Sequence, residues 1–85
     1  MQTIRILYFA RLRESLGLSG EEMPLDQALS VQALMALLAA RGGQWQQEFD
    51  GCRPLRAAVN QTLVANGSMI HAGDEVAFFP PVTGG

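Results

Sequence analysis

The chain has 85 residues, enough for one domain and not for two. Its formal charge is −2 and its six basic residues, all arginines, form no cluster, which argues against nucleic-acid binding. Apolar residues make up 48% of the sequence, which favours a globular core over disorder.

Two further features of the composition concern location and chemistry. No apolar run reaches the roughly 20 residues that cross a bilayer, and no signal peptide is visible, so we expect no membrane segment. The single cysteine, Cys52, excludes an internal disulfide and fits a reducing cytoplasm. The chain contains no lysine, so we expect a partner to hold any anionic substrate.

The first quarter of the chain predicts two strands. Residues 3–9 are rich in β-branched and aromatic side chains. Their alternation predicts a core face of Ile4, Ile6 and Tyr8 and an opposite face of Arg5, Leu7 and Phe9. A short helical turn is predicted over 10–16, ending at Gly17, and a second strand over 21–25 closes a hairpin across 17–20.

The middle of the chain predicts one long helix over 31–41. Ser30 can cap its N-terminus, and apolar residues recur at helical spacing, at Val31, Leu34, Met35 and Leu38. We expect Arg41 in the last turn, where it suits the helix dipole, with Gly42-Gly43 ending the helix. A short helix over about 44–49 would stack Trp45 on Phe49.

The remaining elements are strands. Residues 55–59 and 62–64 flank a turn at Asn60-Gln61, and residues 75–79 form the final strand. A strand pair, one long helix and further strands predict an α+β fold, with a mixed sheet packed on the helix.

The chain ends in Gly84-Gly85, shortly after a double proline, Pro80-Pro81. The prolines should stop sheet pairing at Phe79, because neither carries an N–H. Residues without a Cβ could enter a narrow channel and leave the terminal carboxylate open to attack. We therefore predict a domain over 1–80 and a flexible tail over 81–85. A terminal Gly-Gly alone also fits a frayed end, but a frayed end needs no double proline after an aromatic pair.

Three blocks of sequence resemble the small subunit of molybdopterin synthase, the MoaD family. Residues 58–64 are Ala-Val-Asn-Gln-Thr-Leu-Val, and residues 73–85 join Gly-Asp-Glu-Val, an aromatic pair, two prolines and the terminal Gly-Gly. Residues 7–14 match the family's opening pattern, whereas 43–53 are nondescript. The resemblance implies the β-grasp, or ubiquitin-like, fold, with the first and last strands parallel in its centre.

The resemblance also implies a chemistry for the tail. A ubiquitin-activating-like adenylyltransferase of the MoeB type would consume ATP to form an acyl-adenylate on Gly85, next to Gly84. A persulfide sulfur from a cysteine desulfurase or rhodanese type of donor would then displace AMP and leave a thiocarboxylate. The loaded tail would enter the large catalytic subunit and donate sulfur to cyclic pyranopterin monophosphate (precursor Z), building the molybdopterin dithiolene. The family implies two small and two large subunits, with the catalytic residues on the large one and no cofactor bound permanently here.

A partner-binding surface follows from strand parity and from similarity to ubiquitin-like domains. Val76 and Phe78 would face the helix, which leaves Phe79 pointing outward. We predict an exposed patch of Phe9, Leu63 and Phe79, because such a patch marks an interaction site. Pro80, Pro81, Val82 and Thr83 would extend this contact along the tail. The alternative is that one or two of the patch residues belong to the core.

Other chemically active residues do not form sites. Only Arg53 is near enough in sequence to lower the pKa of Cys52, so a structural or incidental thiol is favoured over a sulfur relay. His71 lacks partners at metal-ligand spacing, and Asp74 and Glu75 would point apart on a strand. Three other functions stay open: a thiazole (thiamine) sulfur carrier, a ubiquitin-like protein modifier, and a plain β-grasp interaction module.

Overall fold

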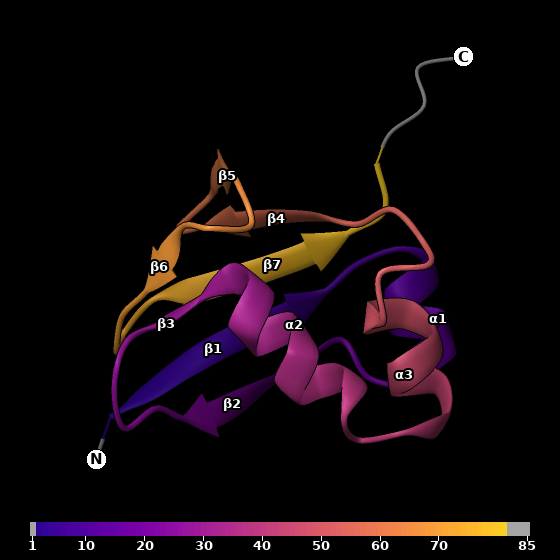
Figure 1. The fold of residues 1–85 in the computed structure, drawn as a ribbon, viewed down its shortest axis with the longest axis horizontal. Coiled ribbons are helices and arrows are strands. Elements are labelled where there is room, and N and C mark those ends of the chain that lie inside the picture. The colour runs from indigo at the N-terminus through magenta and orange to yellow at the C-terminus, as the bar shows by residue number, and fades with distance from the viewer. Residues whose placement is uncertain (1, 82–85) are drawn as a thin grey trace.

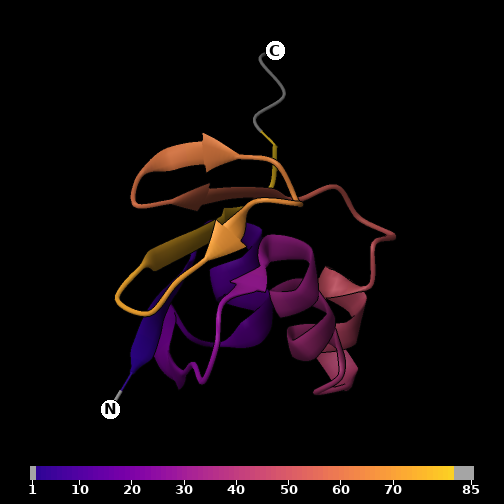
Figure 2. The same cartoon turned by 60° about the vertical axis from the view of Figure 1, so that its left-hand side comes forward.

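The computed structural model describes residues 2–81, which fold into a mixed sheet with helices packed on one side of it (Figures 1 and 2). In sheet order, the strands are β2 (Gly20–Pro24), β1 (Thr3–Tyr8), β7 (Glu75–Phe79), β4 (Arg56–Val59) and β5 (Thr62–Val64). β1 and β7 pair in parallel, and the other neighbours are antiparallel. The first and last strands therefore lie side by side in the middle, as the β-grasp expectation requires.

Side-chain alternation places the core as predicted. Ile4, Ile6 and Tyr8 on β1 are at most 1% exposed, and Val76 and Phe78 on β7 are fully buried. From the other side, the core is closed by the apolar face of α2 (Val31–Ala39), formed by Val31, Leu34 and Leu38. Phe79 is therefore on the outer face of the sheet, since it follows Phe78 directly on an extended strand.

A second, two-stranded sheet is absent from the sequence prediction. β3 (Leu29–Ser30) pairs antiparallel with β6 (Met69–Ile70). Two-residue strands are too short to produce an alternation that sequence analysis can detect. Their pairing brings the β5–β6 connection to the start of α2, where the Val31 N–H donates to the Ser68 carbonyl at 2.9 Å.

The connection between β1 and β2 contains the predicted helical turn. This turn is α1 (Arg11–Leu16), which ends at Gly17 in the left-handed conformation (φ 77°). The two strands pair antiparallel, so the helical turn, its end at Gly17 and the strand pairing were predicted correctly. Leu12 of α1 is fully buried, which anchors this helix at the C-terminal ends of β1 and β7.

The long helix begins as predicted and ends earlier. The Ala33 N–H donates to the Ser30 hydroxyl at 3.0 Å, which confirms the N-cap. α2 ends at Ala39, so the prediction of Arg41 in its last turn was wrong. Arg41 instead donates to both carboxylate oxygens of Glu21 on β2, at 2.8 and 3.0 Å. Arg41 is thus held by a bidentate, charge-assisted contact with β2 and lies beyond the last turn of α2.

Aromatic packing joins α3 (Gly43–Phe49) to the sheet. Trp45 and Phe49 stack with ring centroids 6.2 Å apart, as predicted, and Phe49 meets Phe78 edge-on at 5.2 Å. The Tyr8 hydroxyl donates to Glu21 at 2.7 Å, and the Arg41 guanidinium lies 4.4 Å from the Trp45 ring centroid. The hydrogen bonds from Arg41 lower the pKa of Glu21, while burial and the Glu21 carboxylate raise the pKa of Tyr8. At neutral pH, Glu21 and Arg41 are therefore a charged pair, and the neutral Tyr8 donates a hydrogen bond to Glu21.

The β4–β5 hairpin turns at Asn60 and Gln61, both with positive φ (51° and 71°). Asn60 also binds the neighbouring loop, since its side chain donates to Asp74 at 3.0 Å and accepts from the Glu75 N–H at 3.0 Å. The His71 N–H and the Asn60 amide lower the pKa of Asp74. Asp74 thus fastens the loop that leads into β7, which explains its position without a catalytic role.

Phe78 and Phe79 lie on opposite faces of the sheet, so replacing each by alanine should lower the free energy of unfolding by different amounts. Phe78→Ala should cost about 3–5 kcal/mol of unfolding free energy, because it empties a fully buried site. Phe79→Ala should cost less than about 1 kcal/mol, because its side chain is on the outer face. Urea denaturation of both variants measures the difference. Phe78→Leu keeps part of the volume and is the control if Phe78→Ala does not fold; equal losses at positions 78 and 79 would contradict the face assignment.

Candidate functional site

The sequence predicts the functional site at the C-terminal end of β7. This strand ends at Phe79, and the half-buried Pro80 and Pro81 follow it outside any strand. Val82, Thr83, Gly84 and Gly85 lie outside the described residues, so the tail that they were predicted to form stays a prediction. The described part of the site is the sheet surface that leads to Pro80.

One apolar row crosses the outer face of the sheet. Strand register aligns Leu7, Ala77, Ala58 and Leu63 on β1, β7, β4 and β5 in turn. At about 4.8 Å between strands, the row spans about 14 Å. Leu63 at its far end is 62% exposed. The two alanines between the larger leucines leave the centre of this face low and flat.

A second row lies closer to the tail. The Phe9 N–H donates to the Phe78 carbonyl at 3.2 Å, which sets Phe9 beside Phe79. Phe9 is 45% exposed and Phe79 is half-buried, while Arg56 is the cross-strand partner of Phe79 on β4. All three predicted patch residues are therefore on the outer face. Phe9 and Phe79 share the row nearer the tail, whereas Leu63 belongs to the first row and lies two strands away from Phe79.

We name this surface the outer apolar face and define it by Leu7, Phe9, Ala58, Leu63, Ala77 and Phe79. Sequence analysis missed three of its members. The alternation in β1 already put Leu7 on this face, so strand parity could have included it. Ala58 and Ala77 needed the register between β4 and β7, which only the fold supplies.

The opposite end of the same sheet surface is charged. Arg5 and Glu75 are register partners on β1 and β7, and Arg5 pairs with Glu22 of β2 at 3.8 Å. A hollow of about 310 Å³ at this end is lined by Thr3, Arg5, Glu22, Gly73, Asp74 and Glu75. The outer face is thus apolar towards the tail and predominantly acidic away from it.

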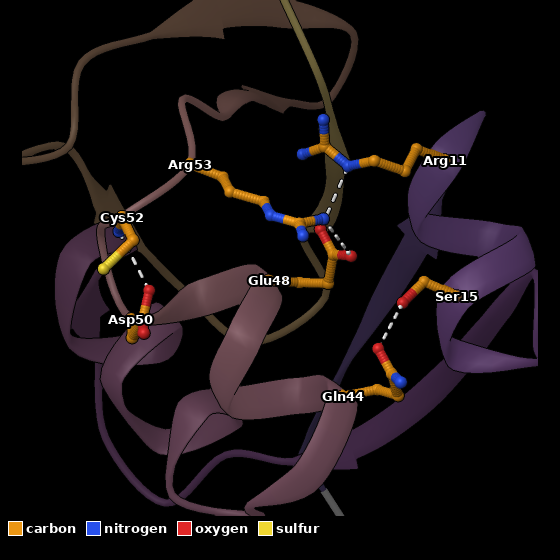
Figure 3. Close-up of polar contacts among 7 residues, drawn as sticks. All are labelled: Arg11, Ser15, Gln44, Glu48, Asp50, Cys52 and Arg53. Carbon is orange, nitrogen blue, oxygen red and sulfur yellow. Dashed lines mark hydrogen bonds and ion pairs between the residues drawn. The ribbon is translucent and has the colours of Figure 1, made fainter.

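A buried carboxylate lies beside the end of β7. Glu48 of α3 is 1% exposed and accepts hydrogen bonds from Arg11 Nε at 3.1 Å and Arg53 Nη1 at 3.3 Å (Figure 3). Arg11 begins α1, and Arg53 lies in the loop between α3 and β4. No sequence pattern predicts this group, because Arg11 and Glu48 are 37 residues apart.

Cys52 lies near this group without taking part in it (Figure 3). Its backbone N–H donates to Asp50 at 2.8 Å, and its thiol is exposed. The Asp50 carboxylate raises the pKa of this thiol, through hydrogen bonding to the thiol side chain and through its negative charge. A raised thiol pKa lowers the fraction of thiolate, which is the nucleophilic form. The surroundings of Cys52 therefore disfavour a role as a sulfur relay.

Two other kinds of feature are absent from the described residues. Within residues 2–81, no three His, Cys, Asp or Glu side chains are grouped to hold a metal ion. No helix in the same range is long and apolar enough to cross a membrane.

Comparisons with known proteins define the class of protein. The model of the ThiS family matches residues 6–85. The molybdopterin synthase sulfur carrier subunit of Escherichia coli (strain K12) is 45% identical over 82 residues, covering 96% of this chain and 99% of the relative. The chain therefore belongs to the ThiS family and, within it, to the molybdopterin synthase sulfur carrier subunits.

Solved structures agree with the fold. The crystal structure of SAMP1 from Haloferax volcanii matches with a TM-score of 0.77 at 27% identity, covering 98% of this chain and 99% of that one. A chain in the complex of subunits 1 and 2 of the molybdopterin-converting factor from Helicobacter pylori matches with a TM-score of 0.67. It is 19% identical and covers 98% of this chain and 99% of its own, so it supports the fold alone.

Proposed function

We propose that the C-terminal carboxylate of Gly85 is the sulfur-carrying group of this protein. ATP would activate this carboxylate as an acyl-adenylate on a ubiquitin-activating-like adenylyltransferase. The terminal sulfur of a persulfide on a cysteine desulfurase or rhodanese type of donor would then attack the acyl carbon and expel AMP, which forms an acyl disulfide. A second thiol would attack the donor sulfur of this disulfide, form a new disulfide with the donor and release the thiocarboxylate. Activation is needed because a carboxylate is a poor electrophile, while sulfur is the better nucleophile for the later transfer.

The observation that carries this proposal is the extent of the family match. It runs through residue 85 and so includes Gly84 and Gly85 as well as the folded domain. The described residues add a second support, since the outer apolar face, exposed at Phe9 and Leu63, ends at Phe79, just before the predicted tail. A surface of this kind beside the reactive end is what a delivered carrier requires.

We also propose that the outer apolar face binds the large catalytic subunit of molybdopterin synthase, with two small and two large subunits in the complex. The Helicobacter pylori protein of the same fold occurs in a complex with subunit 2 of its converting factor. Phe9, Leu63 and Phe79 would bury apolar area against this partner, and Pro80, Pro81, Val82 and Thr83 would guide the tail into its active site. Sulfur would pass there to cyclic pyranopterin monophosphate. The proposal includes a cytoplasmic location, where a reduced Cys52 is stable.

One specific observation favours a second function. The Haloferax volcanii structure, at 27% identity, belongs to a small archaeal modifier protein. Conjugation to target lysines would use the same activated Gly85. It predicts higher-mass adducts of this chain in cell extracts that disappear when Gly85 is deleted. If extracts contain only the unconjugated chain, conjugation is contradicted and sulfur transfer is the one proposed function that remains.

Intact-mass spectrometry tests the thiocarboxylate. After incubation with ATP, the adenylyltransferase and a sulfur source, the C-terminus should exchange one oxygen for one sulfur, a gain of about 16 Da. Deletion of Gly85 should abolish the gain and pterin sulfuration, while thermal stability changes little because chain ends bury little surface. An unchanged mass in the complete mixture would disprove the proposal.

The docking surface is tested by affinity for the large subunit. Phe79→Ala should weaken binding by about 2 kcal/mol or more, because buried aromatic residues dominate interface energies. Met69→Ala is a matched control, since Met69 is 49% exposed but belongs to the separate β3–β6 sheet. Isothermal titration calorimetry measures both, and an unchanged affinity for Phe79→Ala would exclude the outer apolar face as the contact.

A further inference from the structure

Three arginines surround the place where β7 ends. Arg56 lies directly across from Phe79 on β4, and it is exposed. Arg11 follows Phe9 by two residues and begins α1, at the same end of the sheet (Figure 1). Arg53 approaches from the loop after α3, and its guanidinium lies with that of Arg11 over Glu48 (Figure 3). We name Arg11, Arg53 and Arg56 the arginine ring.

The ring carries more positive charge than its surroundings neutralise. Arg11 and Arg53 share one carboxylate, that of Glu48, and the Arg56 side chain has no hydrogen bond or ion pair with another side chain within residues 2–81. The side chains of Arg11 and Arg53 are 38% and 49% exposed, so both still face solvent beyond Glu48. Arg11 Nη2 has no hydrogen-bond partner within residues 2–81. The remaining nearby charges belong to Arg13 and Glu14, adjacent and of opposite sign, and to Asp50, which accepts from Cys52.

Glu48 holds part of the ring in place. A carboxylate that is 1% exposed and bonded by two guanidinium groups fixes both side chains, although one belongs to α1 and the other to a loop. Such charge-assisted hydrogen bonds are strong and directional. The two arginines are therefore ordered before a partner arrives, which reduces the entropy lost on binding.

The charge distribution gives the molecule a basic and an acidic end. Glu22, Asp74 and Glu75 line the far end of the sheet together with Arg5 alone. Although the net charge is −2, an acidic partner surface would be attracted to the tail end and repelled from the other. A basic partner surface would instead be attracted to the acidic end, away from the end of β7. The kind of partner that this arrangement fits is thus one with carboxylates around the entrance for the tail.

We propose, on the basis of the function proposed above, that the arginine ring docks against Asp or Glu side chains around the channel of the large subunit that admits the tail. The guanidinium fork matches a carboxylate in geometry, and the ring adjoins the apolar contact at Phe9 and Phe79. Charges at the rim of an interface act mainly on the association rate and on orientation. The ring therefore steers the tail towards the channel, and the outer apolar face supplies most of the affinity.

The test compares two exposed arginines on the same face of the sheet. Arg56→Gln removes a ring charge, and Arg5→Gln removes a charge from the acidic end as the matched control. Stopped-flow association with the large subunit is measured for both, for Arg53→Gln and for the wild type, from about 0.05 to 0.5 M salt. Arg11 is left unchanged, so that Glu48 always keeps one partner, and thermal unfolding verifies that every variant is folded.

At low salt, Arg56→Gln and Arg53→Gln should each slow association by about two- to fivefold and flatten its salt dependence. Arg5→Gln should not slow it, and the differences should vanish at high salt because the charges are screened. Equal behaviour of Arg56→Gln and Arg5→Gln, or faster association after loss of a ring charge, would overturn the inference. Failure of the wild type to bind the large subunit would instead overturn the proposed function itself, and this inference with it.

Discussion

The parallel pairing of β1 with β7 is the constraint on which the rest of the structure depends. It joins the two ends of the chain in the centre of the sheet, so the last strand is held on both edges, by β1 and by β4. Because the strands run in the same direction, the start of α1 and the end of β7 lie at one end of the molecule (Figure 1). The end of β7 consequently lies beside Phe9 and Arg11, although these residues are about 70 positions away in the chain.

The same pairing decides which aromatic side chains are available to a partner. Register places Tyr8 with Phe78 towards the helices, where Phe49 and Trp45 close over them. Phe9 and Phe79 are then forced outward together, since successive residues of a strand alternate. In each of the two neighbouring pairs, Tyr8–Phe9 and Phe78–Phe79, the first aromatic side chain is therefore in the core and the second is on the outer face.

Two carboxylates, Glu21 and Glu48, are paired with arginines, and they connect different parts of the fold. Glu21 is satisfied by Tyr8 and Arg41 and joins β2 to the segment before α3, so it serves the fold. Glu48 is more deeply buried and joins α1 to the loop after α3, next to the tail. A buried carboxylate is costly unless it is paired, so each position constrains the arginines around it. In the second case, those arginines belong to the surface that we propose for docking to the partner.

Local sequence alone determined several parts of this protein. The alternation in residues 3–9, the Ser30 cap, the stacked Trp45 and Phe49, and the final strand were all predicted correctly, because each depends on residues within one turn or one strand. The outward positions of Phe9 and Phe79 followed from the same parity. The tail motif and its resemblance to a known family identified the class of protein, although Gly84 and Gly85 are outside the described residues.

Only the tertiary structure decided what lies between distant segments. It extended the predicted patch to Ala58 and Ala77, because cross-strand register cannot be read from one strand. It placed Arg41 on Glu21 rather than in a helix end, and it brought Arg11 to Glu48, since these contacts join residues 20 and 37 positions apart. The physical reason is common to all of them. Periodicity reports which face a side chain takes, whereas the neighbour that it meets there depends on how the chain returns to itself.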